Sequence, residues 1–199
     1  MVPRFFLLRH GRSLANDQGV IASRPVNAAE AYGLTAVGRE QVRSSVSGAR
    51  GTGRLAGPFF LASSPLLRTR ESAETAGEAL GVTPVVDPRL TERDFGDFEV
   101  TSDENYRRVW QADLLDPTHR RWGVESVVSV LRRARAVVAD LARDGRAPTV
   151  VLCTHGDVAS TLLCASLGLP LGRHREVGAM EPGALRELTS VEALLGGHA

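Results

Sequence analysis

The stretch FFLLRHGRSLAN, residues 5–16, holds four consecutive apolar residues that end abruptly at Arg9 and His10. A second stretch, VVLCTHGDV at residues 150–158, repeats the pattern and ends at His155. In both cases a glycine follows the histidine. Continuous apolar runs are typical of strands that are buried on both faces of a sheet. The two stretches therefore predict two buried strands, each with a histidine at its carboxyl end.

The rest of the chain alternates between short apolar runs and helical patterns. Buried strands are predicted at residues 4–8, 58–62, 84–86 and 149–153, with a further edge strand at 184–189. Helices are predicted at residues 35–49, 65–80, 103–115, 124–143 and 157–167. This alternation predicts an α/β fold, with a mainly parallel central sheet flanked by helices on both faces. The length of 199 residues fits a single domain over residues 1–199.

Composition narrows the class of protein. Hydrophobic residues make up 43% of the chain, charged residues 24%, and the net charge is +1, so neither nucleic acid nor a membrane is an expected partner. No apolar run reaches the roughly 18 residues of a membrane span, and no signal peptide is recognised, so a cytoplasmic location is expected. Cys153 and Cys164 lie in apolar surroundings and are expected to be reduced core thiols.

Two long irregular regions, residues 17–34 and 93–123, are expected to be functional or mobile, because loops of this size are uncommon in compact domains. In open parallel sheets, ligands bind beyond the carboxyl ends of the strands. Arg9, His10 and His155 are therefore expected to meet at one edge of the sheet, although nearly the whole chain separates them.

A third basic side chain is expected to join them. Ser64 and Pro65 form a good helix start, with serine at the N-cap, which places Arg68 near the positive end of that helix. Arg70 and Glu74, spaced i and i+4, are expected to form an exposed ion pair. Fixed positive charge beside imidazoles disfavours a metal and attracts a dianion, so phosphate or sulfate is the predicted ligand. Glycine after each histidine is expected to allow a sharp turn and close approach of the backbone to the ligand.

An enzyme acting on phosphate would also need a nucleophile and an acid. Histidine can serve as a nucleophile, and a carboxyl can protonate a poor leaving oxygen. The stretch RLTERDFGDFE offers four carboxylates, and spacing does not choose among them: Glu92, Asp94, Asp97 and Glu99.

Several motifs together resemble the histidine phosphatase superfamily, which has the phosphoglycerate mutase-like fold. LLRHGRSLAN resembles the RHG signature, and SSPLLRTRESAET resembles the SSPLxRAxQTA segment. LTERDFGDFE is similar to LxExxFGxWEG, VVLCTHGDV to the second histidine segment, and LTAVGREQ to the LTxxGxxQA helix. They follow one another in the order found in the family.

The resemblance implies roles for individual residues. His10 would be the nucleophile that becomes phosphohistidine, and Glu92 would be the proton donor. Five residues would surround the phosphate or the substrate: Arg9, Asn16, Arg68, His155 and Gly156. No metal and no organic cofactor is implied.

Some positions depart from the family pattern. Phe98 and Val100 replace the Trp and Gly of the WEG segment, and the extra Val124 in WGVES leaves any role of Glu125 and Ser126 open. The loop at residues 17–34 is longer than in compact members. Arg24 and Tyr32 of that loop are candidates for a substrate wall.

The expected activity is hydrolysis of a small phosphorylated metabolite, as in a phosphoric monoester hydrolase. The alternatives are a phosphoglycerate mutase-type phosphoryl transfer, with Arg107 and Arg108 reading a second anion, and a non-catalytic phosphate-binding module. A metal-dependent hydrolase using His10, His155 and Asp157 is disfavoured by the neighbouring arginines. The sequence identifies neither the substrate nor the oligomeric state, and a homodimer is one state that it allows.

Overall fold

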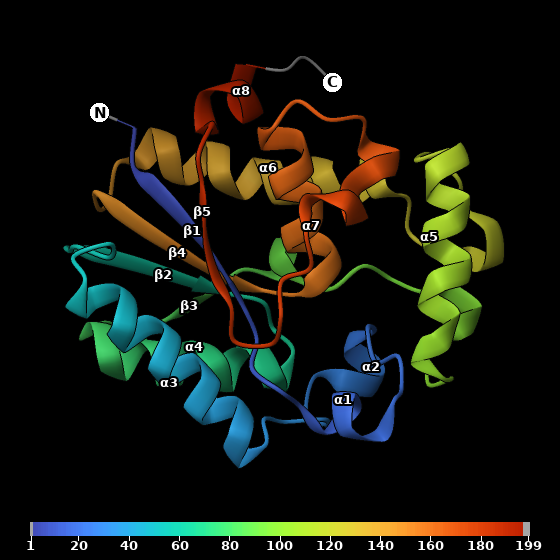
Figure 1. Cartoon of the computed structure of the whole chain (residues 1–199), viewed down its shortest axis with the longest axis horizontal. Coiled ribbons are helices and arrows are strands. Elements are labelled where there is room, and N and C mark those ends of the chain that lie inside the picture. Colours follow the sequence, from blue (N-terminus) through green and yellow to red (C-terminus); the bar gives the residue numbers. More distant parts are fainter. Residues whose placement is uncertain (1, 197–199) are drawn as a thin grey trace.

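The computed structural model describes residues 2–196 (Figure 1); the ends of the predicted domain, residues 1 and 197–199, lie outside this range. Its centre is a five-stranded sheet in the order β3-β2-β4-β1-β5. The strands are β1 (Arg4–Arg9), β2 (Phe59–Ser63), β3 (Val85–Val86), β4 (Thr149–Thr154) and β5 (Leu185–Leu188). All neighbouring pairs run parallel except β1 with β5. The mainly parallel sheet and the edge strand near residues 184–189 are thus confirmed.

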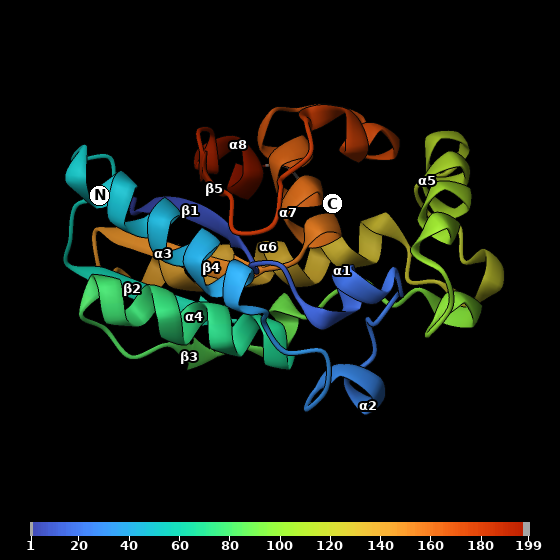
Figure 2. The ribbon, with the colours of Figure 1, turned by 60° about the horizontal axis from the view of Figure 1, so that its bottom comes forward.

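Helices cover both faces of the sheet, as expected. The helices are α1 (Leu14–Gln18), α2 (Pro25–Ala28), α3 (Ala36–Gly51), α4 (Leu67–Leu80), α5 (Tyr106–Leu115), α6 (Val127–Asp144), α7 (Gly156–Ser166) and α8 (Val191–Gly196). In Figures 1 and 2, α3 and α4 lie on one side of the sheet, α6, α7 and α8 on the other, and α5 stands apart beside the sheet edge that carries α1. No helix within residues 2–196 is long and apolar enough to cross a membrane.

Strand β1 shows why its apolar run is continuous. Phe5 and Leu7 are fully buried in the core under α6, α7 and α8, while Phe6 and Leu8 are fully buried in the core under α3 and α4. Successive side chains of a strand point to opposite faces, so a strand covered on both faces needs apolar residues at every position. The sheet thereby holds the end of β1 rigidly between two packed layers.

Three local expectations were wrong. Helix α4 begins at Leu67, not at residue 65, and its N-cap is Leu66. The Ser64 hydroxyl lies 2.7 Å from His155 Nε2 and is engaged there rather than capping the helix. Arg70 does not pair with a residue of its own helix, because Glu30 accepts two hydrogen bonds from its Nη2 at 2.8 and 2.9 Å.

Two glycines bring the chain after β1 into direct contact with the first turn of α3. A Cβ at Gly11 would overlap the carbonyl oxygen of Gly38, and a Cβ at Gly38 would lie 2.7 Å from the backbone nitrogen of Arg12. The Arg12 carbonyl also accepts hydrogen bonds from the backbone nitrogen of Thr35 at 2.9 Å and from its hydroxyl at 3.1 Å. Neither Gly11 nor Gly156 has a positive φ, so close packing, and no left-handed turn, is what requires glycine at position 11.

We predict that Gly38→Ala lowers the free energy of unfolding by about 1–3 kcal/mol, because the added methyl meets backbone atoms that cannot rotate away. Gly48→Ala on the same helix is the matched control, since a Cβ there has no atom within 4 Å. That change should leave stability equal or raise it by up to about 1 kcal/mol through helix propensity. Urea unfolding of both variants tests the contact, and equal stability of the two would contradict it.

Candidate active site

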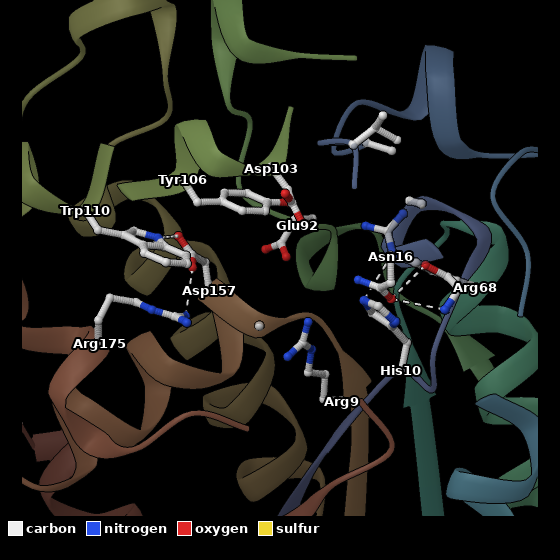
Figure 3. A pocket seen from close by; sticks show the side chains of 15 residues that line it. Arg9, His10, Asn16, Arg68, Glu92, Asp103, Tyr106, Trp110, Asp157 and Arg175 are labelled. Atoms are coloured by element: carbon white, nitrogen blue, oxygen red, sulfur yellow. Dashed lines mark hydrogen bonds and ion pairs between the residues drawn. The ribbon is translucent and has the colours of Figure 1, made fainter. Parts of the chain in front are cut away.

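A pocket of about 210 Å³ opens at the carboxyl ends of β1 and β4 (Figure 3). The parallel pairing of these strands places Arg9 opposite Thr154, so that the two residues that follow, His10 and His155, become neighbours. Their ring centroids lie 5.2 Å apart. The expectation that the two histidine motifs meet at one sheet edge is therefore confirmed.

His10 is held as a neutral imidazole with a defined orientation. Its Nδ1 donates to the Gly11 carbonyl at 2.8 Å, so the lone pair is on Nε2, which accepts a hydrogen bond from Arg68 Nε at 3.2 Å. Burial, together with the positive charges of Arg68 and Arg9, lowers the pKa of His10 well below its ordinary value. The free-base form, which is the nucleophilic one, therefore predominates at neutral pH.

His155 is also neutral and takes the opposite tautomer. Arg68 Nη2 lies 3.1 Å from its Nδ1, and because a guanidinium can only donate, Nδ1 is the acceptor. Its Nε2 then carries the hydrogen and donates to the Ser64 hydroxyl. Burial and the charge of Arg68 hold the pKa of His155 well below its ordinary value. One arginine thus orients both imidazoles.

Arg9 and Arg68 are cations without a carboxylate partner among the described residues. Arg68 is 4% exposed, and Arg9 Nη1 donates to the Met180 carbonyl at 2.5 Å. Arg9 Nε and Arg68 Nη1 are buried with no hydrogen-bond partner in the described part of the chain. Buried charges and buried donors are costly unless they are paired. The pair is therefore suited to an anion that accepts several hydrogen bonds, such as phosphate.

Glu92 lines the same pocket, and its carboxyl lies across the pocket from these groups. It is 8% exposed, and its Oε1 accepts a hydrogen bond from the Arg93 backbone at 2.9 Å. Burial, followed by the negative charge of Asp157, raises the pKa of Glu92 to about 7. Because Oε1 is engaged as an acceptor, Oε2 is the oxygen that carries the proton. Glu92 can therefore donate a proton near neutral pH.

The other three carboxylates of this segment have different surroundings. Asp94 pairs with Arg24 at 2.9 Å, and Glu99 accepts hydrogen bonds from the backbone and hydroxyl of Ser23. Neither these two nor Asp97 lines the pocket. The structure thus separates Glu92 from its neighbours, which spacing could not do.

Asn16 and Gly156, expected near the substrate, also line the pocket. The Asn16 side-chain oxygen accepts from the backbone nitrogen and the hydroxyl of Ser13, both at 3.0 Å, which fixes the start of α1. Its amide nitrogen has no partner within residues 2–196 and remains available to a ligand. Gly156 is the first residue of α7, with the Arg9 guanidinium beside it.

Several further expectations do not fit the pocket. Arg24 is bound to Asp94, and Tyr32 packs in a small core beside α1 and α2, so neither lines the wall. In the WGVES segment, which departs from the family pattern, the two residues whose role was left open have structural contacts. Glu125 pairs with Arg133, and Ser126 caps α6. Arg107 and Arg108 also lie outside the lining, and Arg108 stacks over the rings of Phe98 and Trp122.

Sequence reasoning missed most of the wall opposite the arginines, which is formed by Asp103, Tyr106, Trp110, Asp157 and Arg175. A signal existed for two of them. Tyr106 and Trp110 are four residues apart in a predicted helix and therefore share one face. Their rings stack at 5.3 Å with an interplanar angle of 6°. Nothing in the sequence pointed to Arg175, which lies in an irregular segment.

Metal-ligating side chains do not gather in the described residues. Within residues 2–196, histidine, cysteine, aspartate and glutamate form no group of three or more that could hold a metal ion. The three residues that a metal site would use have other partners. His10 accepts a hydrogen bond from Arg68, His155 is bonded to Ser64, and Asp157 accepts a hydrogen bond from Arg175.

Known proteins are similar to this chain in sequence and in fold. The family model of the histidine phosphatase superfamily, branch 1, matches residues 5–192. Glucosyl-3-phosphoglycerate phosphatase of Mycobacterium tuberculosis is 30% identical over 201 residues, covering 94% of this chain and 85% of that protein. "Probable phosphoglycerate mutase GpmB" of Yersinia enterocolitica is 30% identical over 170 residues, covering 83% and 75%.

Solved structures agree. Mycobacterial glucosyl-3-phosphoglycerate phosphatase in complex with VO3 superposes with a TM-score of 0.76 at 26% identity, covering 93% of this chain and 92% of that one. The same protein with inorganic phosphate gives a TM-score of 0.71 at 26% identity, covering 93% and 88%. The chain therefore belongs to branch 1 of the histidine phosphatase superfamily.

Proposed function

We propose that the protein is a phosphatase that hydrolyses a small phosphorylated metabolite through a phosphohistidine intermediate on His10. The observation that carries this proposal is the pair of buried, unpaired guanidinium donors beside a neutral imidazole, with Glu92 opposite them. The arginines would hold a phosphoryl group, the imidazole would attack it, and the carboxyl would protonate the leaving oxygen. Its relatives include a phosphatase for a small phosphorylated metabolite, which supports the proposed class of reaction.

In the first step, the lone pair on His10 Nε2 attacks phosphorus and the bond between phosphorus and the ester oxygen breaks. The proton on Glu92 Oε2 moves to that oxygen, so that an alcohol leaves. Arg68 Nε, which bonds His10 Nε2 in the free site, would transfer its hydrogen bond to a phosphoryl oxygen. Arg9 Nε and Arg68 Nη1 would acquire the acceptors that they lack. Donors fixed before the reaction stabilise the developing charge without reorganisation.

In the second step, water attacks the phosphorus of phosphohistidine and the phosphorus–nitrogen bond breaks. The Glu92 carboxylate formed in the first step accepts the proton of that water. Inorganic phosphate is released, and His10 Nε2 regains its lone pair. A pKa near 7 suits Glu92 to both roles, because the best acid and the best base both have a pKa close to the working pH.

Phosphoryl transfer back to a substrate, as in a mutase, is the second candidate, and the similarity to a probable phosphoglycerate mutase favours testing it. A non-catalytic phosphate-binding module would lack turnover altogether. A panel of phosphorylated metabolites, assayed for released inorganic phosphate and for isomerised product, separates the three. Hydrolysis gives free phosphate, whereas a mutase gives mainly isomer.

The first prediction concerns the covalent intermediate. His10→Ala should abolish turnover, because no other side chain offers a free lone pair at that position. Wild-type protein quenched during turnover of a phosphorus-32-labelled substrate should carry acid-labile label, and the variant should carry none. Turnover is expected to persist in EDTA, since no metal takes part in the proposed steps. Equal labelling of both proteins would reject His10 as the acceptor.

The second prediction concerns Arg68, which together with Arg9 would hold the phosphoryl group. Arg68→Lys should lower kcat/KM by roughly 10- to 100-fold, because an ammonium cannot reach both imidazoles and the phosphoryl oxygens as the planar fork does. Arg70→Lys is the matched control on the same helix, since Arg70 pairs with Glu30 at the surface and should change kcat/KM by less than about twofold. Similar losses in the two variants would show that Arg68 does not hold the phosphoryl group.

The third prediction separates the acid role of Glu92 from a role in binding. Glu92→Gln should slow hydrolysis of alkyl phosphates by roughly 10²- to 10⁴-fold, because an alkoxide leaves poorly without a proton. With p-nitrophenyl phosphate, phosphorylation should survive and only the attack of water should lose its base. A burst approaching one equivalent of nitrophenol, followed by slow turnover, is therefore expected. Equal slowing of both substrates without a burst would show that Glu92 is not the acid.

A further inference from the structure

Asp157 occupies the pocket wall opposite the two arginines, and the steps above do not use it. It is the second residue of α7, directly after His155 and Gly156, and it is 3% exposed. A carboxylate that is buried so deeply stays ionised only if hydrogen-bond donors and positive charges surround it.

Four groups from three segments surround the Asp157 carboxylate. Trp110 Nε1 of α5 lies 3.1 and 3.2 Å from its two oxygens, and Arg175 Nη1 donates to Oδ1 at 3.0 Å. Arg93 Nη1, from the loop that carries Glu92, lies 3.4 Å from Oδ2, and His174 Nε2 lies 3.8 Å from it. Burial by itself would raise the pKa of Asp157, but these donors and charges outweigh it and hold the pKa below its ordinary range. Asp157 is therefore a fixed negative charge.

The cations around Asp157 are largely neutralised by it and by one other carboxylate. Arg175 has no other carboxylate partner within residues 2–196, and its guanidinium lies 4.0 Å from the centre of the Trp110 ring. Arg93 is 1% exposed and forms a bidentate pair with Asp113 of α5, at 2.7 and 2.8 Å. Without Asp157, Arg175 would therefore have no carboxylate partner within residues 2–196, and Arg93 would keep only Asp113.

We propose that Asp157 is a positioning residue that keeps Glu92 in its protonated form by placing a fixed negative charge beside it and by neutralising Arg175 and Arg93. This role rests on the phosphatase activity proposed above, in which Glu92 must supply a proton. Two positive charges face Glu92 and favour the ionised carboxylate, Arg68 from α4 and Arg9 from β1. The backbone N–H of Arg93 favours it as well, through its hydrogen bond to Oε1. Tyr106 from α5 is neutral, because burial raises the pKa of its hydroxyl.

Loss of the Asp157 charge would change the pKa of Glu92 in the same direction directly and through the two arginines. Removing the negative charge of Asp157 weakens the repulsion that disfavours ionised Glu92, and it leaves Arg175 and Arg93 less neutralised. Both changes lower the pKa of Glu92. The protonated fraction that remains at neutral pH would then be small, and with it the supply of protons for an alkyl leaving group.

Carbon-13 NMR of glutamate carboxyl carbons tests this directly, with the Glu92 signal assigned from its disappearance in Glu92→Gln. Asp157→Asn preserves the shape and should lower the pKa of Glu92 by about one unit or more. Asp157→Glu keeps the charge and should keep the pKa near the wild-type value even if it costs thermal stability. Trp110→Phe removes a donor to Asp157 and no charge, so it should not lower the pKa of Glu92. An unchanged pKa in folded Asp157→Asn overturns the proposal.

The pH dependence of kcat/KM for an alkyl phosphate distinguishes failure of this inference from failure of the proposed function. In wild type, activity should fall as pH rises through about 7, where Glu92 loses its proton. In Asp157→Asn, this descending limb should move to lower pH by the same amount as the NMR titration. A shifted titration with an unmoved limb would support the effect of Asp157 on Glu92 and reject Glu92 as the acid. An unmoved titration rejects the role of Asp157 whatever the activity.

Discussion

Two guanidinium groups set the conditions for the rest of the site: Arg68, which is buried, and Arg9, which is half-buried. They lie at two imidazoles and have no carboxylate partner within residues 2–196. Burial and the charge of the two arginines keep His10 and His155 unprotonated, and the unsatisfied donors of the arginines make an anion the matching ligand. Such a cluster of positive charge costs free energy unless an anion balances it. The large apolar cores on both faces of the sheet, and the parallel pairing of β1 with β4, hold it together in the absence of a ligand.

The two sides of the pocket differ in charge, and each favours the neutral form of a different group. At the end of β1, unneutralised positive charge favours the phosphoryl group and the free base of the nucleophile. On the opposite wall, arginines are paired with buried aspartates, so the carboxyl that lies between the two sides experiences a negative neighbour. Both imidazole and carboxyl are thereby neutral at the same pH. Neither could keep that state if the two sides exchanged surroundings.

The fold and the phosphate end of the pocket could be predicted because they depend on local pattern. A continuous apolar run marks a strand covered on both faces, and parallel strands deliver their carboxyl ends to one edge, which made neighbours of His10 and His155. The buried ion pairs behind the opposite wall could not be predicted in this way. Arg93 and Asp113 are 20 residues apart and meet in the interior only because α5 folds back over the loop that follows Glu92. At Ser64 the local pattern predicted a helix N-cap, but the hydroxyl forms a hydrogen bond with His155, which is distant in the sequence.

Trp110 gives the pocket a built-in optical reporter. Its indole lies between the ring of Tyr106 and the guanidinium of Arg175, and its Nε1 is bound to Asp157 at the pocket wall. Indole emission responds to the polarity and charge of its surroundings, and the chain contains only two tryptophans. The second, Trp122, packs against Phe98 away from the pocket and supplies a constant background. Entry of an anion or departure of a product is therefore expected to change the intrinsic fluorescence of Trp110, without a label.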